Sequence, residues 1–152
     1  MKINNLTDTG KDVLSDFALA AMMGTSYQDG EVAEEEAGLF WSFVKENRDY
    51  LDSDHPAFPI SERLNRRANS SDTHIENMPA AHEMLDRVHT VLESVDEGDE
   101  RNMYAWWVMH LCYSIAEIDG NVDLSEQMYI VDLFRNLGWD YAEYIQELSN
   151  ED

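Results

Sequence analysis

The sequence predicts an all-α protein: a single compact domain of about six or seven helices spanning residues 1–152. Apolar residues recur at three- and four-residue spacing along most of the chain, which is typical of helices with one buried face. No alternating pattern typical of a strand runs for more than a few residues. Hydrophobic residues make up 43% of the chain, so a core can form without disulfides.

The expected helices follow one another between glycine, proline and acidic breaks. We expect them over residues 11–27, 33–47, 79–95, 100–117, 124–137 and 141–148. The stretch 100–117 is apolar nearly all round, which predicts a central, buried helix. Gly138 is expected to end one helix, and Asp140 with Glu143 forms a capping-box pattern for the next.

Residues 48–78 differ from the rest, because they are polar and contain Pro56 and Pro59. We expect an irregular connector here, with one short helix near residues 60–68. The connector contains three arginines, Arg63, Arg66 and Arg67. They are predicted to hold this short helix on the acidic body of the protein.

The charge balance limits the classes of partner. Lys and Arg number 10 against 32 Asp and Glu, which gives a formal net charge of −22. Direct nucleic-acid binding is excluded, since phosphates require a basic surface. Cations, basic protein surfaces and DNA-binding proteins that accept an acidic mimic remain as partners.

Location is also constrained by the sequence. The apolar run over residues 105–116 is too short to span a bilayer, so no membrane insertion is expected. The N-terminal residues lack the apolar core of a signal peptide. Cys112 is the single cysteine, which fits a reduced compartment. We therefore expect a cytoplasmic protein, with an oligomeric state that the sequence leaves open.

The most informative motif occurs twice. Asp-Gly-x-Val-x-x-x-Glu spans residues 29–36 and again 119–126, a constant offset of 90 (119 − 29). Each copy follows an apolar helix and precedes an amphipathic one. The repeat predicts two helix–turn–helix halves, about residues 11–47 and 100–148, packed around a shared core.

The motif carboxylates are candidate metal ligands. Asp29, Glu36, Asp119 and Glu126 would present hard oxygen ligands, which Ca²⁺ and Mg²⁺ prefer and Zn²⁺ less so. A competing interpretation is purely structural, because Asp123 and Glu126 also form a capping box. An EF-hand is disfavoured, since Ile115 would occupy one of its ligand positions.

The sequence resembles the tellurite-resistance protein B (TerB-like) family in two stretches, AMMGTSYQDGEVAEEEAGLF and YSIAEIDGNVDLSEQMYIVDLFRNLGW. The resemblance covers about residues 11–148. It implies an all-helical, non-catalytic, cytoplasmic domain with a metal-chelating acidic face. It also implies a role in tellurite and other chemical stress, with membrane-associated or other protein partners. The long connector and the extreme charge depart from the family pattern.

A different class of function fits the charge alone. An acidic decoy or inhibitor, resembling a DNA mimic, would bind a basic protein surface without a metal. Adaptation to high salt would also explain the acidity. No phosphate-binding glycine loop, nucleophile elbow or Cys/His pair is present, so no catalytic residue is assigned.

Several other residues are also candidates for a site. His82, Asp86 and His89 share one helix face with spacing that Zn²⁺ can use, but a fourth ligand is missing and we expect them to face solvent. His110 is expected to be a hydrogen-bonded core histidine. Either Trp106 or Trp107 is expected to line a pocket or interface, as is the tyrosine pair of the last helix, Tyr141 and Tyr144.

Overall fold

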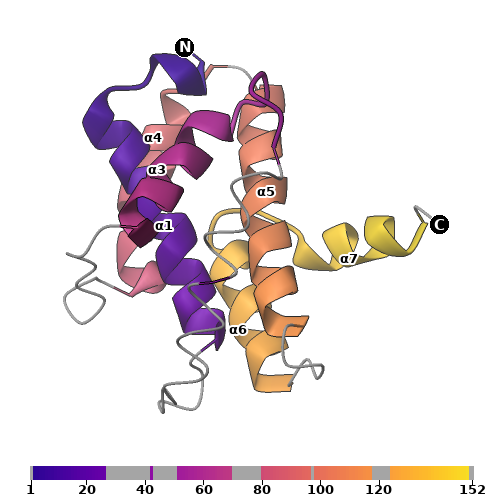
Figure 1. Ribbon diagram of the computed structural model, residues 1–152. Helices are drawn as coiled ribbons and strands as arrows, with labels where there is room; N and C mark the ends of the chain where they lie inside the picture. The colour runs from indigo at the N-terminus through magenta and orange to yellow at the C-terminus, as the bar shows by residue number, and fades with distance from the viewer. Residues whose placement is uncertain are drawn as a thin grey trace.

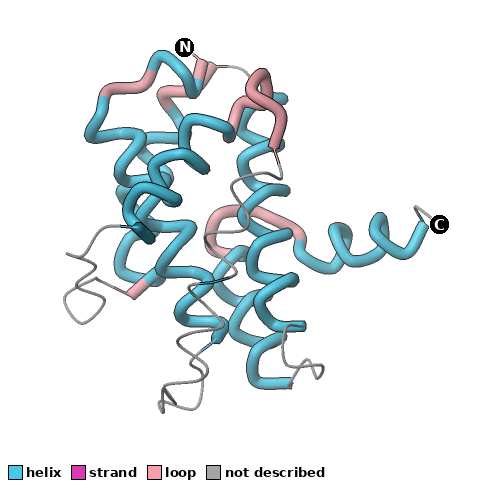
Figure 2. The backbone as a smooth tube through the Cα atoms, in the orientation of Figure 1, coloured by secondary structure: helices cyan, strands magenta, loops and turns pink. Residues whose placement is uncertain are grey.

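The computed structural model describes residues 2–26, 42, 51–69, 80–96, 98–117 and 124–150. Within these ranges the backbone forms six α-helices and no strand, which confirms the all-α prediction (Figures 1 and 2). The helices are α1 (Asp8–Ser26), α3 (Phe58–Asn69), α4 (Leu85–Glu93), α5 (Gly98–Glu117), α6 (Leu124–Arg135) and α7 (Tyr141–Asn150). Short 3₁₀ turns at Ile3–Asn5 and Ala81–Met84 precede α1 and α4. The helix expected over residues 33–47 lies outside the described residues, apart from the helical residue 42.

The helix ends follow from local chemistry. α1 begins three residues earlier than its apolar spacing indicates, because the Thr7 hydroxyl accepts a hydrogen bond from the Gly10 N–H at 3.1 Å. Gly138 ends α6 as predicted, in the left-handed region with φ of 76°. The N–H of Trp139 then reaches back to the Phe134 carbonyl at 3.0 Å, which completes a Schellman cap.

The described part of the connector, residues 51–69, contains one helix, as expected. α3 covers Phe58–Asn69 and packs against α1. The Arg63 guanidinium lies 2.6 Å from a carboxylate oxygen of Asp8 and 2.6 Å from one of Asp12. This confirms the predicted docking for Arg63. Arg66 is exposed, and the side chain of Arg67 lies outside the described part.

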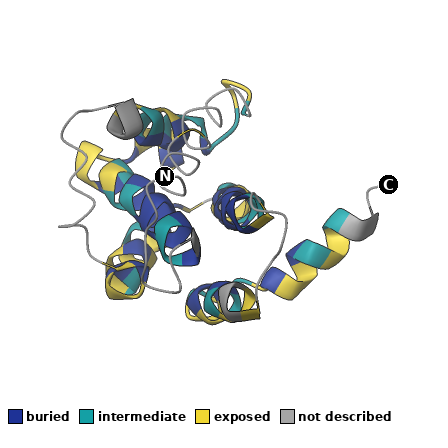
Figure 3. Ribbon diagram, turned by 60° about the horizontal axis from the view of Figure 1, so that its bottom comes forward, coloured by how far each residue is buried: buried dark blue, intermediate teal, exposed yellow. Residues whose placement is uncertain are grey.

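Two helices, rather than one, are buried on nearly all sides. α5 has no exposed residue between Tyr104 and Ala116, as predicted for a central helix. In α1, every residue from Phe17 to Met22 is buried. α1 packs against α3, α4, α5 and α6, whereas α5 packs against α1, α6 and α7. Figure 3 shows the buried faces of these helices turned toward one another.

α1 and α5 run parallel. Near their starts, the Ile3 N–H donates to a Glu100 carboxylate oxygen at 2.8 Å. Further along, the buried Tyr104 hydroxyl donates to the Leu14 carbonyl at 2.8 Å. Near their ends, Cys112 is hydrogen-bonded to the Thr25 side chain. Residue numbers rise together through these three contacts, so both helices end at the same end of the molecule, the lower end in Figure 1.

Candidate functional site

Most of the predicted cation ligands fall outside the described part of the chain. This is true of Asp29, Glu36 and Asp119. Glu126 belongs to the first turn of α6, but its side chain is likewise not described. What the structure does place is the set of helices that flank the two motifs. The first motif begins three residues after α1, and the second begins two residues after α5.

These flanking helices converge on one tightly packed cluster. Gly24 of α1 faces Tyr129 of α6 so closely that a β-carbon at Gly24 would overlap the tyrosine hydroxyl. The Thr25 hydroxyl donates a hydrogen bond to the Ala21 carbonyl at 2.8 Å. The Thr25 side chain is also hydrogen-bonded to Cys112. The last turn of α1 therefore packs against both α5 and α6, at the end where both motifs leave the helices.

The ionisable side chains of this cluster, Cys112 and Tyr129, are buried and uncharged. Burial raises the pKa of the Cys112 thiol to about 12, and its hydrogen bond to Thr25 opposes this rise only in part. Burial also raises the pKa of Tyr129 to about 12. Both groups are neutral at physiological pH, so Cys112 lacks the thiolate that nucleophilic catalysis requires.

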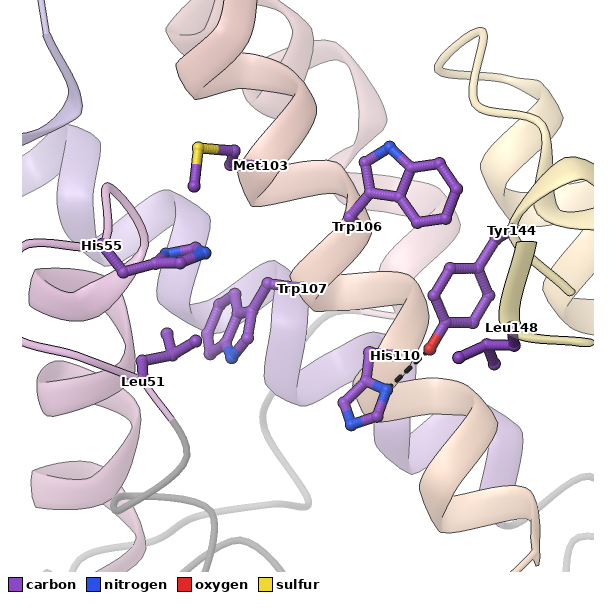
Figure 4. Close-up of a pocket in the computed structure, with 8 residues that line it drawn as sticks. All are labelled: Leu51, His55, Met103, Trp106, Trp107, His110, Tyr144 and Leu148. Carbon is purple, nitrogen blue, oxygen red and sulfur yellow. Dashed lines mark hydrogen bonds between the residues drawn. The ribbon is translucent and has the colours of Figure 1, made fainter. Parts of the chain in front are cut away.

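A pocket lies elsewhere, between α5, α7 and the residues that precede α3. Its volume is about 340 Å³ and it is open to solvent. Figure 4 shows the residues that line it, which are Leu51, His55, Met103, Trp106, Trp107, His110, Tyr144 and Leu148. Most of them are apolar or aromatic, as in sites that bind the apolar part of a ligand.

Helical spacing assembles two walls of the pocket. On α5, Met103, Trp106, Trp107 and His110 are three, four and seven residues apart, which places them on one face. On α7, Tyr144 and Leu148 are one turn apart. The Asp140 carboxylate caps α7 by accepting the Glu143 N–H at 3.0 Å, as its capping pattern predicts.

The aromatic rings form a corner around a polar contact. Trp106 and Tyr144 have ring centroids 5.0 Å apart, with planes inclined at 56°. The Tyr144 hydroxyl lies 2.6 Å from Nδ1 of His110 (Figure 4). Trp107 forms the deeper part and is only 5% exposed. Its indole N–H has no acceptor among the described residues, which is uncommon for a buried donor.

Both histidines of the pocket favour the neutral form. Burial lowers the pKa of His110. Burial also lowers the pKa of His55, although Asp54 and Asp52 act in the opposite direction. Nδ1 of His55 accepts the Ala57 N–H at 3.0 Å, so the proton of the neutral ring is on Nε2. The pocket therefore contains two uncharged imidazoles.

The sequence found part of this pocket. It predicted that one tryptophan of the adjacent pair would line a pocket, whereas both do, because residues 106 and 107 lie on the two edges of the same helix face. It also proposed a pocket or interface role for Tyr141 and Tyr144. The structure confirms this for Tyr144, whereas Tyr141 is buried against Phe134. His110 is hydrogen-bonded as expected but only half-buried. His55 and Leu51 were missed, since no spacing relates them to α5.

The histidines of the zinc hypothesis point to different partners. His82 Nε2 lies 3.1 Å from a carboxylate oxygen of Asp132 on α6. His89 Nε2 lies 2.9 Å from Glu93, one turn along α4. Both are exposed, as predicted. Across the described ranges, no three His, Cys, Asp or Glu side chains come together as a metal site would require.

Comparisons with protein-family models, with curated proteins and with solved structures find no match for this chain. The TerB-like resemblance therefore rests on the motifs of the sequence alone. Among the described helices, none is both long and apolar enough to cross a membrane.

Proposed function

We propose that this chain is a non-catalytic acidic domain that binds a divalent cation through its two Asp-Gly-x-Val-x-x-x-Glu motifs. The observation that supports this most is the parallel packing of α1 and α5. Because Thr25 contacts Cys112, the two helices reach the same end of the molecule side by side. Asp29 follows Thr25 by four residues, and Asp119 follows Cys112 by seven.

The donor chemistry fits the proposed ion. The four carboxylates Asp29, Glu36, Asp119 and Glu126 offer hard oxygen ligands, so Ca²⁺ or Mg²⁺ is proposed rather than Zn²⁺. Cys112 and Tyr129 lie near the shared end of α1 and α5. Both are neutral, so they would not add to the negative charge there. The resemblance to TerB-like proteins supports a cytoplasmic role in tellurite or other chemical stress, exerted through protein partners.

A second candidate, the acidic decoy, is favoured by the surface of α6. Leu124 and Met128 lie one turn apart and are 69% and 64% exposed. Such an apolar pair on a chain of net charge −22 suits contact with a basic protein that also has an apolar surface. In this alternative the function is spread over the surface and no cation is needed.

Calorimetric titration of the metal-free protein with Ca²⁺, Mg²⁺ and Zn²⁺ separates the two. We would run it in about 150 mM NaCl, which screens diffuse attraction. The test variant carries Asp29→Asn, Glu36→Gln, Asp119→Asn and Glu126→Gln. The matched control removes the same charge from exposed residues elsewhere, with Glu62→Gln, Glu83→Gln, Asp86→Asn and Glu93→Gln.

We expect saturable binding at low stoichiometry in the wild type and the control, and none in the test variant. Weak binding that does not saturate and is equal in all three proteins would contradict the cation proposal. The decoy would then be the better description, and affinity for a basic protein surface would fall similarly in both variants.

A further inference from the structure

The pocket between α5 and α7 is small but has room for one long side chain. Its volume of about 340 Å³ is at the lower end of the range of roughly 300–1,000 Å³ that small-ligand sites cover. Met103 at its mouth is 40% exposed. Trp106 and Tyr144 present inclined rings to the interior, and Leu51 and Leu148 supply aliphatic walls (Figure 4).

Several exposed acidic residues, here called the acidic rim, are close in sequence to the residues that line the pocket. Asp52 and Asp54 both precede His55 and are near enough to act against the lowering of its pKa, and Glu143 and Glu147 directly precede Tyr144 and Leu148 on α7. Asp99 lies one turn before Met103 on α5. All five are exposed.

Positive charge is absent from the lining itself. None of the eight residues around the pocket is a lysine or arginine. Arg101 is two positions from Met103, which turns it about 200° around α5 and away from the pocket. His55 and His110 are kept uncharged by burial, so they do not repel a cation.

We propose that this pocket receives a lysine or arginine side chain of a basic protein partner. The aliphatic stem would lie along Leu51, Leu148 and the tryptophan rings, while the charged group meets aromatic faces and the acidic rim. A cation over an aromatic face is attracted by the negative charge density of the ring, and long basic side chains bury their aliphatic stems readily. This inference deepens the partner-binding part of the proposed function and is independent of the Asp-Gly motifs.

The test uses blocked pentapeptides, acetyl-Gly-Gly-X-Gly-Gly-amide, titrated into the full-length ¹⁵N-labelled protein at about 150 mM NaCl to screen diffuse attraction. Residue X is varied in two matched pairs. Arginine is compared with its uncharged isostere citrulline, and lysine is compared with the uncharged norleucine. The readout is the pair of indole N–H signals from Trp106 and Trp107. We expect saturable shifts with arginine and lysine, and about tenfold weaker binding of citrulline and norleucine.

Two variants locate the site. Trp106→Leu removes an aromatic face while keeping the wall apolar, and it should weaken the arginine peptide several-fold, as followed by the Trp107 signal. The rim variant Asp52→Asn/Glu147→Gln should weaken it too, whereas Asp86→Asn/Glu83→Gln removes equal charge on α4 and its preceding turn and should not. Circular dichroism checks that each variant is folded.

Three outcomes would overturn the proposal. They are equal affinity for the charged and uncharged peptides, absence of saturable binding, and equal loss in the rim and control variants. The variant that lacks the four motif carboxylates should bind the arginine peptide through the same indole shifts as the wild type. The experiment can therefore contradict the pocket proposal without contradicting the cation proposal, and the reverse.

Discussion

Gly24 shows at the scale of one residue how closely α1 and α6 pack. Alanine normally stabilises a helix by about 1 kcal/mol relative to glycine. At this position its β-carbon would overlap the Tyr129 hydroxyl, and such overpacking costs about 1–3 kcal/mol. Gly24→Ala should therefore lower the free energy of unfolding, measured by urea titration.

A paired substitution isolates the cause of that loss. Tyr129→Leu removes the ring, whose hydroxyl, Cζ and Cε1 would all overlap the new β-carbon, so it should cost less in the Gly24→Ala background than in the wild type. Gly98→Ala is the control, because its β-carbon would meet only Arg101 at an ordinary 3.6 Å. Stability of Gly24→Ala equal to or above that of the wild type would contradict this prediction, because the overlap would then cost no more than the roughly 1 kcal/mol that alanine gains over glycine in a helix.

His110 makes the free energy of unfolding depend on pH. Its pKa is lowered by burial, so the unfolded chain takes up a proton at higher pH than the folded one. Its contribution to stability is intact above the ordinary histidine pKa of about 6.5. The contribution declines below that pH until the lowered folded-state pKa is passed. The difference in unfolding free energy between wild type and His110→Gln should thus shrink from pH 7.5 to pH 5.5, and an unchanged difference would contradict this.

At the scale of elements, the turn between α6 and α7 positions one wall of the pocket. Gly138 adopts a positive φ and Asp140 caps α7, so these two residues fix the direction of α7 and thereby the position of Tyr144 in the pocket. Asp140→Ala should lower the unfolding free energy by about 1 kcal/mol, as loss of an N-cap usually does. Hydrogen exchange should speed up first in α7. Glu143→Gln keeps the cap acceptor and serves as the control; protection that changes equally in both variants would argue against the cap.

At the scale of the whole molecule, the net charge of −22 opposes folding by self-repulsion. Raising NaCl from 10 to 500 mM shortens the screening length from about 30 Å to less than 8 Å. We therefore expect the urea midpoint to rise with NaCl while the slope of the transition stays constant. A midpoint that is independent of salt would contradict this and would mean that repulsion between the carboxylates does not limit the stability of the fold.

The sequence predicted the helices well, because apolar spacing, Gly138 and Asp140 are local signals. Among the described helices it named one central helix where there are two, although the six residues from Phe17 to Met22 are all apolar and already indicated a second buried helix. It found the α5 and α7 walls of the pocket through their aromatic residues. It missed His55, because only tertiary packing brings that residue to α5.

The parallel arrangement of α1 and α5 also affects how the chain folds during synthesis. Leu14 and its partner Tyr104 are 90 residues apart (104 − 14), so this contact requires a late, long-range closure. At translation rates of about 5–20 residues per second, synthesis of the 90 residues between them takes roughly 5–18 s. During this time the face of α1 that packs against α5 has no partner. A nascent chain that stops before residue 98 would present this apolar surface to chaperones, whereas one that extends past α5 would bury it.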